Sequence, residues 1–265
     1  MTSDLPALIA KRFIQRRDVK AVQFSNGAWS PDRELKDKSR HGLGFKKKHL
    51  DAHLSGEATY GHYLIDGDNR ARVFALDIDL EKAGTWIENG PEAQPILHEC
   101  NPREIWGDRA ALGAREWYKY QMKMLATMFA KVITADMELP CAAAYSGSKG
   151  IHIYGFLGDS PALAAHEGAL LAIDLIDQFE PLRGKVFFKH RNQDPVTGYP
   201  SFSVEAFPKQ PSLDGKDLGN LMRLPLGKNL KSKDPTFFID LTSPMGVMSP
   251  HPDPIRLLES GNPFE

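Results

Sequence analysis

The stretch "VFALDIDL" (73–80) decides the fold, because it alternates between two kinds of side chain. In a strand, residues i and i+2 point to the same face. The even-numbered residues 74–80 therefore form one apolar face, and Asp77 and Asp79 lie together on the other. Two carboxylates this close repel each other, and a divalent cation that prefers oxygen ligands removes that cost. The stretch predicts a strand that packs on a core and binds Mg²⁺ or Mn²⁺; two surface acids on an edge strand are the alternative.

Strands and helices alternate around this stretch, which favours an α/β or α+β fold. Asn26-Gly27 is a strong hairpin signal, and the strands at 61–65 and 71–80 are expected to form another hairpin across "DGDN". Between 84 and 113, spaced Gly and Pro residues indicate loops or short helices. The remaining expected elements are helices at 7–16, 114–133 and from Ser160-Pro161 to about 179, and strands at 19–24, 142–145, 151–156 and 202–208.

The composition limits the classes of protein that fit. The chain has 265 residues, enough for one large domain or two lobes around a shared core. No apolar run is long enough to span a membrane, and the charged N-terminal stretch does not resemble a signal peptide, so we expect a cytoplasmic protein. The net charge of −1 gives no global sign of nucleic-acid binding. Any such binding must use local basic runs, at 11–17 and 46–49, which are more often solvated surface.

A second motif, "YSGSKGIHIYGF" (145–156), places a glycine turn between two expected strands. The glycines allow positive φ angles and a close backbone approach, and the N–H groups of such a turn can surround an anion. The motif suits a polyphosphate; an ordinary hairpin or the bare GXXG of a KH domain are the alternatives. The residues that would hold the anion are Ser146, Lys149, Gly150 and His152.

Two later stretches supply further polar groups. In "SVEAFPKQ" (203–210), Glu205 alternates with apolar neighbours and is a candidate third carboxylate of a two-metal site, or simply an exposed residue. In "GNLMRLPLGK" (219–228), Arg223 lies among apolar residues, where a cation is costly unless paired with a phosphate or a carboxylate. Asn220 and Lys228 lie in the same glycine-bounded stretch and are further candidates for nucleotide binding.

Taken in order and spacing, "LDID", "SGSKGIH", "VEAFPKQ" and "GNLMRLPLG" resemble the archaeo-eukaryotic primase superfamily, and the bacterial, mobile-element and phage primase-polymerases within it. The resemblance covers about residues 15–230. It implies an RRM-like catalytic sheet, antiparallel or mixed, with flanking helices and a smaller N-terminal α/β unit. We expect one catalytic domain of two lobes, with an N-terminal unit at about 1–70, a core at about 71–245 and a tail at 246–265. A longer protein with a helicase or accessory domain fits the same resemblance.

The resemblance also implies roles for individual residues. Asp77 and Asp79 match the first metal-binding motif, and Glu205 matches the third, where many members have Asp. Ser146, Lys149 and His152 match the second motif, which holds the triphosphate of the incoming nucleotide. Arg223 matches a basic residue near that triphosphate, and Lys228 is a further candidate. The candidate template contacts are Arg16, Arg17, Lys46, Lys47 and Lys48.

The predicted activity is template-directed nucleotidyl transfer from NTPs or dNTPs on single-stranded DNA, with two Mg²⁺ or Mn²⁺ ions. A metal-dependent nuclease or phosphohydrolase is one alternative, which needs the carboxylates but no triphosphate pocket. A non-catalytic nucleic-acid-binding domain is another, and it would bind without divalent metal. No four-ligand Cys/His cluster is visible in the sequence, and His98 and Cys100 alone do not indicate zinc.

Overall fold

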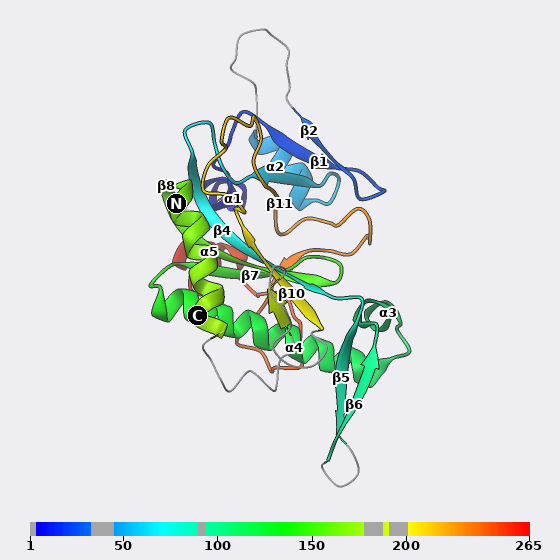
Figure 1. Ribbon diagram of the computed structural model, residues 1–265. Helices are drawn as coiled ribbons and strands as arrows, with labels where there is room; N and C mark the ends of the chain where they lie inside the picture. The colour runs from blue at the N-terminus through cyan, green and yellow to red at the C-terminus, as the bar shows by residue number, and fades with distance from the viewer. Residues whose placement is uncertain (1–3, 33–44, 90–93, 178–187, 191–200) are drawn as a thin grey trace.

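Two β-sheets and a separate hairpin organise the chain (Figure 1). The computed structural model describes residues 4–32, 45–89, 94–177, 188–190 and 201–265. The small sheet has the order β11-β3-β1-β2, with β1 Lys20–Gln23, β2 Trp29–Asp32, β3 Tyr60–Tyr63 and β11 Leu221–Arg223. The large sheet has the order β12-β7-β8-β4-β10-β9, with β4 Arg70–Leu80, β7 Cys141–Tyr145, β8 Gly150–Pro161, β9 Phe188–His190, β10 Phe202–Phe207 and β12 Phe237–Phe238. The hairpin pairs β5 Gly84–Asn89 with β6 Pro95–Cys100.

The helices belong to different parts of this framework. The long helices α4 and α5 cover one side of the large sheet (Figure 1). Helix α2 contacts β3 of the small sheet, and α1 contacts β4 and β8 of the large sheet together with α2 and α6. This mixed α+β architecture, with mainly antiparallel sheets and flanking helices, confirms the predicted fold class. The helices are α1 Leu5–Phe13, α2 Lys47–Leu54, α3 Pro102–Gly107, α4 Leu112–Lys131, α5 Ala162–Asp177 and α6 Pro254–Ser260, and a π-helical turn, η1 Val132–Asp136, continues α4.

The core of the large sheet has the topology of an RRM. The chain runs β4–α4–β7–β8–α5–β10, and these strands lie in the order β10-β4-β8-β7. This is the split βαβ arrangement, with the first and third strands side by side in the centre. Both crossing helices lie on the same face, so the opposite face is left for other contacts.

The strands β3 and β4 do not form the hairpin that the sequence predicts. A tight turn does follow β3, and Asp66 N donates to Arg70 O at 3.0 Å. The two strands then separate: β3 pairs with β1 and β11, while β4 pairs with β8 and β10. The physical reason is burial, because the middle of β4 is buried and needs a neighbouring strand on each side.

One further expectation needs correction. Within 84–113, expected to be loops or short helices, residues 84–89 and 95–100 form the strands of the β5–β6 hairpin, in which Trp86 stacks on His98 at 4.4 Å between ring centroids. The division into an N-terminal unit at about 1–70 and a core stays a prediction; β11, from residues 221–223, pairs with β3 of the small sheet. The expected helical end near residue 179 lies outside the described residues.

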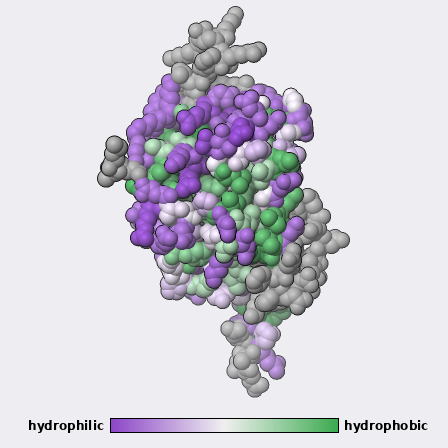
Figure 2. All heavy atoms as spheres, turned by 90° about the vertical axis from the view of Figure 1, so that its left-hand side faces the viewer, coloured by the Kyte–Doolittle hydropathy of each residue, from purple (hydrophilic) through white to green (hydrophobic). Residues whose placement is uncertain are grey.

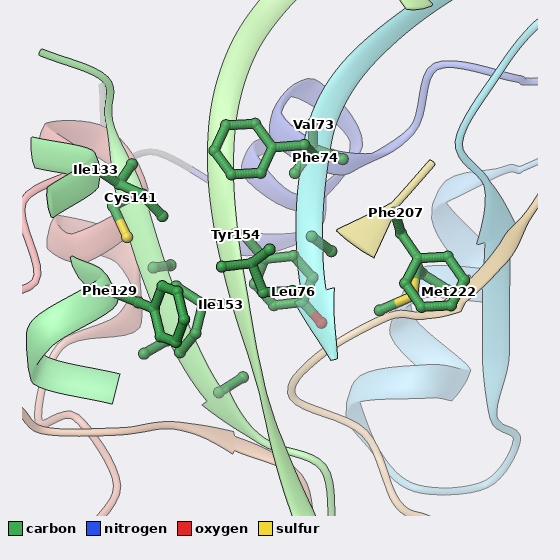
Figure 3. Close-up of a cluster of buried hydrophobic side chains, with 14 of the residues drawn as sticks. Val73, Phe74, Leu76, Phe129, Ile133, Cys141, Ile153, Tyr154, Phe207 and Met222 are labelled. Atoms are coloured by element: carbon green, nitrogen blue, oxygen red, sulfur yellow. The ribbon is translucent and has the colours of Figure 1, made fainter. Parts of the chain in front are cut away.

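Close packing of α5 on the large sheet depends on two glycines beside one phenylalanine. Phe74 of β4 and Ile153 of β8 lie on the helix side of the sheet, where Ile133 of η1 belongs to the same buried cluster (Figure 3). A side chain at Gly155 of β8 would overlap the Phe74 ring, and one at Gly168 of α5 would come within 3.2 Å of it. The ring therefore fills space that both glycines leave open.

Hydrophilic and apolar residues are unevenly distributed over one face of the molecule (Figure 2). Seen from the side on which α5 lies, hydrophilic residues dominate the upper part and apolar residues gather near the middle (Figure 2). Leu163 and Leu171 of α5 are each 48% exposed. Among the described residues, no helix is both long enough and apolar enough to cross a membrane.

We predict that Gly155→Ala lowers the free energy of unfolding by about 1–3 kcal/mol, because the added methyl group must displace the Phe74 ring. Urea unfolding measures the change. Gly113→Ala is the control, because nothing lies within 4 Å of that helical position. The control should be neutral or stabilising by up to about 1 kcal/mol. Equal stability of Gly155→Ala and the parent chain would contradict the packing described here.

Candidate active site

Three carboxylates lie on the face of the large sheet opposite the helices. In the register of the strands, Glu205 of β10 is paired with Asp77 of β4, and Asp77 is paired with His152 of β8. Asp79 lies two residues further along β4, opposite Gly150. Paired residues share a face of a sheet, so the predicted acids come together on one surface. Their side chains are 13–25% exposed, which leaves them accessible from outside.

Each carboxylate has a nitrogen-bearing side chain beside it. Lys149 Nζ donates to Asp79 Oδ2. His152 Nε2 lies 3.4 Å from Asp77 Oδ1, and Lys209 Nζ lies 3.4 Å from Glu205 Oε2. The charges of Asp79 and Glu205 are thus offset by ammonium groups, whereas Asp77 has an imidazole beside it.

Local backbone conformation brings Lys149 to Asp79. Gly147, with a φ of 73°, forms the turn between β7 and β8, and Ser146 N donates to Gly150 O at 3.0 Å to close it. A side chain at Gly150 would overlap the Asp79 carboxylate. Gly150 therefore leaves the space that the Asp79 carboxylate occupies, and Lys149 supplies the cation beside it. This turn is the one predicted from "SGSKGIH".

His152 is a neutral hydrogen-bond donor near pH 7 rather than a cation. Burial, with a further contribution from Arg223, lowers the pKa of His152 to about 4. Burial also raises the pKa of Tyr154, so this residue keeps its proton. Tyr154 Oη lies 2.9 Å from His152 Nδ1 and can donate to it. The ring proton is then on Nε2, directed at Asp77.

Arg223 reaches this face from the small sheet. It lies on β11, and its guanidinium donates to Ser146 O in the β7–β8 turn and packs over Trp29, 5.9 Å from the ring centroid. Asp77 and Asp79 are close enough to act on its charge, although burial is the larger influence and lowers its pKa. Its Nε has no hydrogen-bond partner among the described residues. The structure thus brings Arg223 near Asp77 and Asp79, and its role beside a triphosphate stays a prediction.

Two other predicted residues, Asn220 and Lys228, make their contacts with residues other than the three carboxylates. Asn220 Oδ1 accepts from Lys209 N at 2.7 Å, so Asn220 fixes the segment that carries Lys209 beside Glu205. Lys228 lies against Gly56 at the end of α2, and its carbonyl accepts from Thr59 Oγ1. No hydrogen bond or ion pair joins Lys228 to the three carboxylates, and its role in phosphate binding stays a prediction.

The basic residues predicted to contact a DNA template differ in their exposure and in their ion pairs. Arg16 is 8% exposed and its guanidinium contacts Asp18 and Asp217, so little of it faces solvent. Arg17 is exposed. Lys46 caps α2, while Lys47 pairs with Asp51 at 3.0 Å and Lys48 is exposed. Contact of these residues with DNA stays a prediction.

The donor set fits a hard divalent cation, because it consists of three carboxylates on adjacent strands. The side chains as placed do not form a ready site: among the described residues, no group of three or more His, Cys, Asp or Glu is arranged to hold a metal. Asp79 and Glu205 contact Lys149 and Lys209 instead. A metal ion would require these carboxylates to turn away from their ammonium partners.

Sequence reasoning missed three supporting residues. Tyr154 orients His152, and its position two residues further along the strand was a usable signal. Lys209 appears in the quoted "VEAFPKQ", four residues after its partner Glu205. Trp106 Nε1 donates to Ser148 O at 2.6 Å and supports the glycine turn, but nothing in the sequence links these two segments.

A comparison with known protein families identifies the family of this chain. Residues 7–262 match the family described as "TOTE conflict system, Archaeo-Eukaryotic Primase domain". The chain belongs to this family. The resemblance expected from the sequence is therefore confirmed, and members of the family generally use divalent metal ions. The roles of individual residues in this primase domain stay predictions.

A solved structure is also similar to this primase domain. It is titled "Polymerase Domain from Mycobacterium tuberculosis Ligase D in complex with DNA". The similarity covers 88% of this chain and 78% of that chain, with 13% sequence identity and a TM-score of 0.45. A comparison with curated proteins found no match.

We predict that the primase domain loses stability as the pH falls from about 6.5 towards 4. Burial lowers the pKa of both His152 and His53 to about 4, whereas an unfolded histidine titrates near 6.5. In this window the unfolded chain binds protons that the folded chain does not, so acid favours unfolding. Urea unfolding at pH 7.5 and 4.5 should show a smaller acid loss for His152→Gln than for the parent chain. His98→Gln, on the protruding β5–β6 hairpin, is the control; a loss in His152→Gln equal to that of this control would argue against a neutral buried His152.

Proposed function

We propose that this chain is a primase-polymerase, which transfers nucleotides from NTPs or dNTPs to a growing strand on a single-stranded DNA template. One observation carries the proposal: Asp77, Asp79 and Glu205 share a face with phosphate-binding chemistry supplied by Lys149, His152 and Arg223. The carboxylates alone would also suit a nuclease. The cations and the neutral donor beside them favour a substrate with a chain of phosphates.

Three side chains would bind the triphosphate. Lys149 and Arg223 are cations from different sheets that both lie near Asp79. His152 adds an Nε2 proton held in direction by Tyr154. A triphosphate would attract Lys149 from Asp79 and would supply Arg223 Nε with an acceptor, which it lacks in the described part of the chain. Phosphate binding and release of the carboxylate are thus linked through Lys149.

The reaction replaces one bond to phosphorus by another. The 3′-hydroxyl oxygen of a primer or first nucleotide loses its proton to solvent and attacks the α-phosphorus, and the bond from that phosphorus to the pyrophosphate oxygen breaks. Asp77, Asp79 and Glu205 would hold two divalent ions, which when bound stabilise the attacking and leaving oxygens. Lys149 and Arg223 offset the charge that develops on the pyrophosphate. The Nε2 proton of His152 donates a hydrogen bond to the same group.

We predict that Asp77→Asn and Asp79→Asn each abolish incorporation of labelled nucleotide on primed single-stranded DNA with Mg²⁺ or Mn²⁺. The substitution keeps the shape of the side chain but removes the anion that a divalent cation needs. Glu205→Gln should lose incorporation more than DNA affinity. The assay is run with and without primer, and with NTPs and dNTPs, so that it also reports initiation and sugar preference.

The matched control is Asp136→Asn, an exposed acid on η1 away from the carboxylate face. It should keep full activity. Substantial synthesis by Asp77→Asn or Asp79→Asn would remove these residues from the catalytic role. Degradation of DNA without synthesis by the parent chain would favour a nuclease, and metal-independent DNA binding without either reaction would favour a binding domain.

We predict that Lys149→Ala and His152→Ala weaken binding of a non-hydrolysable nucleotide by roughly tenfold to a hundredfold, because each removes a hydrogen bond to a charged phosphate. Affinity for template DNA should change little. Calorimetric titration of nucleotide, with DNA affinity measured in parallel, tests both variants. Lys131→Ala, an exposed lysine at the end of α4, is the control. Unchanged nucleotide affinity in both variants would refute the triphosphate site.

A further inference from the structure

A pocket of about 580 Å³ lies beside the β7–β8 turn, bounded by α3, the start of α4 and the segment 232–237. One wall of it belongs to the side of the large sheet opposite the carboxylates, while Lys149 at its edge contacts Asp79. Tyr145, in its wall, is paired with Ile151 and Phe237, and this row lies on the helix side of the large sheet. Asp77 and Glu205 belong to the opposite side. The site described above therefore does not account for this pocket.

The lining of the pocket is strongly basic. Four cations contribute to it, and among the described lining residues the only acid is Asp234. Two of the cations have partners elsewhere: Lys149 contacts Asp79, and Arg103 donates to Leu80 O at 2.6 Å. Arg109 is exposed and, in the described part of the chain, makes no hydrogen bond or ion pair. An unpartnered guanidinium beside two other arginines is suited to an anion with several oxygens.

The walls that face these cations are aromatic and fixed. Trp106 Nε1 and Tyr145 Oη both donate to Ser148 O, at 2.6 and 2.5 Å. Arg115 lies over the Trp106 ring, 5.3 Å from its centroid, and donates to Trp106 O at 2.5 Å. The rings are thus held in place before any ligand binds, which reduces the entropy lost on binding.

We propose that this pocket is a second nucleotide site, which binds a nucleoside phosphate on the helix side of the sheet, independently of the carboxylate face. Arg109 and Arg115 bind the phosphate, and the aromatic wall contacts the base or sugar. The pocket volume lies within the range of ordinary ligand sites. A free nucleotide and a unit of single-stranded DNA present the same chemistry, and the experiment separates them.

The test measures binding to the full chain in EDTA, which suppresses metal-dependent binding at the carboxylates. The probes are ATP and, separately, a ten-nucleotide oligo(dT) with a 5′-hydroxyl group. Arg109→Ala should weaken binding of at least one probe by about tenfold or more, the effect of losing a hydrogen bond to a charged group. Loss for ATP assigns the site to a free nucleotide, and loss for oligo(dT) alone assigns it to a strand. Arg109→Lys should recover part of the affinity.

Arg256→Ala is the matched control, an exposed arginine on α6 outside the pocket lining. The same titrations in the Asp77→Asn variant should give the same Arg109 effect, because the two sites are separate. A second readout is the indole N–H resonance of Trp106, which should shift when the bound probe is added. An Arg109→Ala affinity equal to that of Arg256→Ala for both probes, or an unmoved Trp106 resonance, would overturn the proposal.

Discussion

The strict alternation of β4 is the constraint on which the rest of the structure depends. The strand is central, so its two faces meet different surroundings: Phe74, Leu76 and Ile78 are buried under the helices, and Asp77 and Asp79 face the other way. A shift of one residue in pairing would exchange the faces and bury both acids among apolar side chains. The burial of the apolar face therefore also fixes the register that sets Asp77 beside Glu205 and His152.

Charge balance is the second constraint. Three acids on one face repel each other, and two of them form ion pairs: Asp79 with Lys149, and Glu205 with Lys209. Asp77 has instead a buried imidazole, whose pKa is lowered and which can only donate a hydrogen bond near neutral pH. The ion pairs of Asp79 and Glu205 are therefore exchangeable, because an ammonium group on a flexible side chain can leave one anion and bind another.

The two sheets meet through Arg223. Its strand belongs to the small sheet, but its guanidinium donates to a carbonyl in the turn of the large sheet. The same turn is supported from the opposite side by Trp106, which donates to Ser148 O. One glycine turn is thus held by a residue from each side of the large sheet. This position connects the carboxylate face with the basic pocket, since Lys149 belongs to the rim of both.

The sequence by itself determined the elements whose cause is local. The period-two pattern at 73–80 determined the strand and the shared face of its acids, glycine spacing determined the β7–β8 turn, and helical spacing determined α4. The order of these motifs was also enough to indicate the family, which the match over residues 7–262 confirms. Only the tertiary structure decided that β3 and β4 separate into different sheets and that β11 joins the small sheet. It also decided that His152 is neutral, that Trp106 reaches the turn and that Arg109 lines the pocket beside it. These outcomes depend on burial and on contacts between segments far apart in the chain. The local pattern of residues determines neither of them.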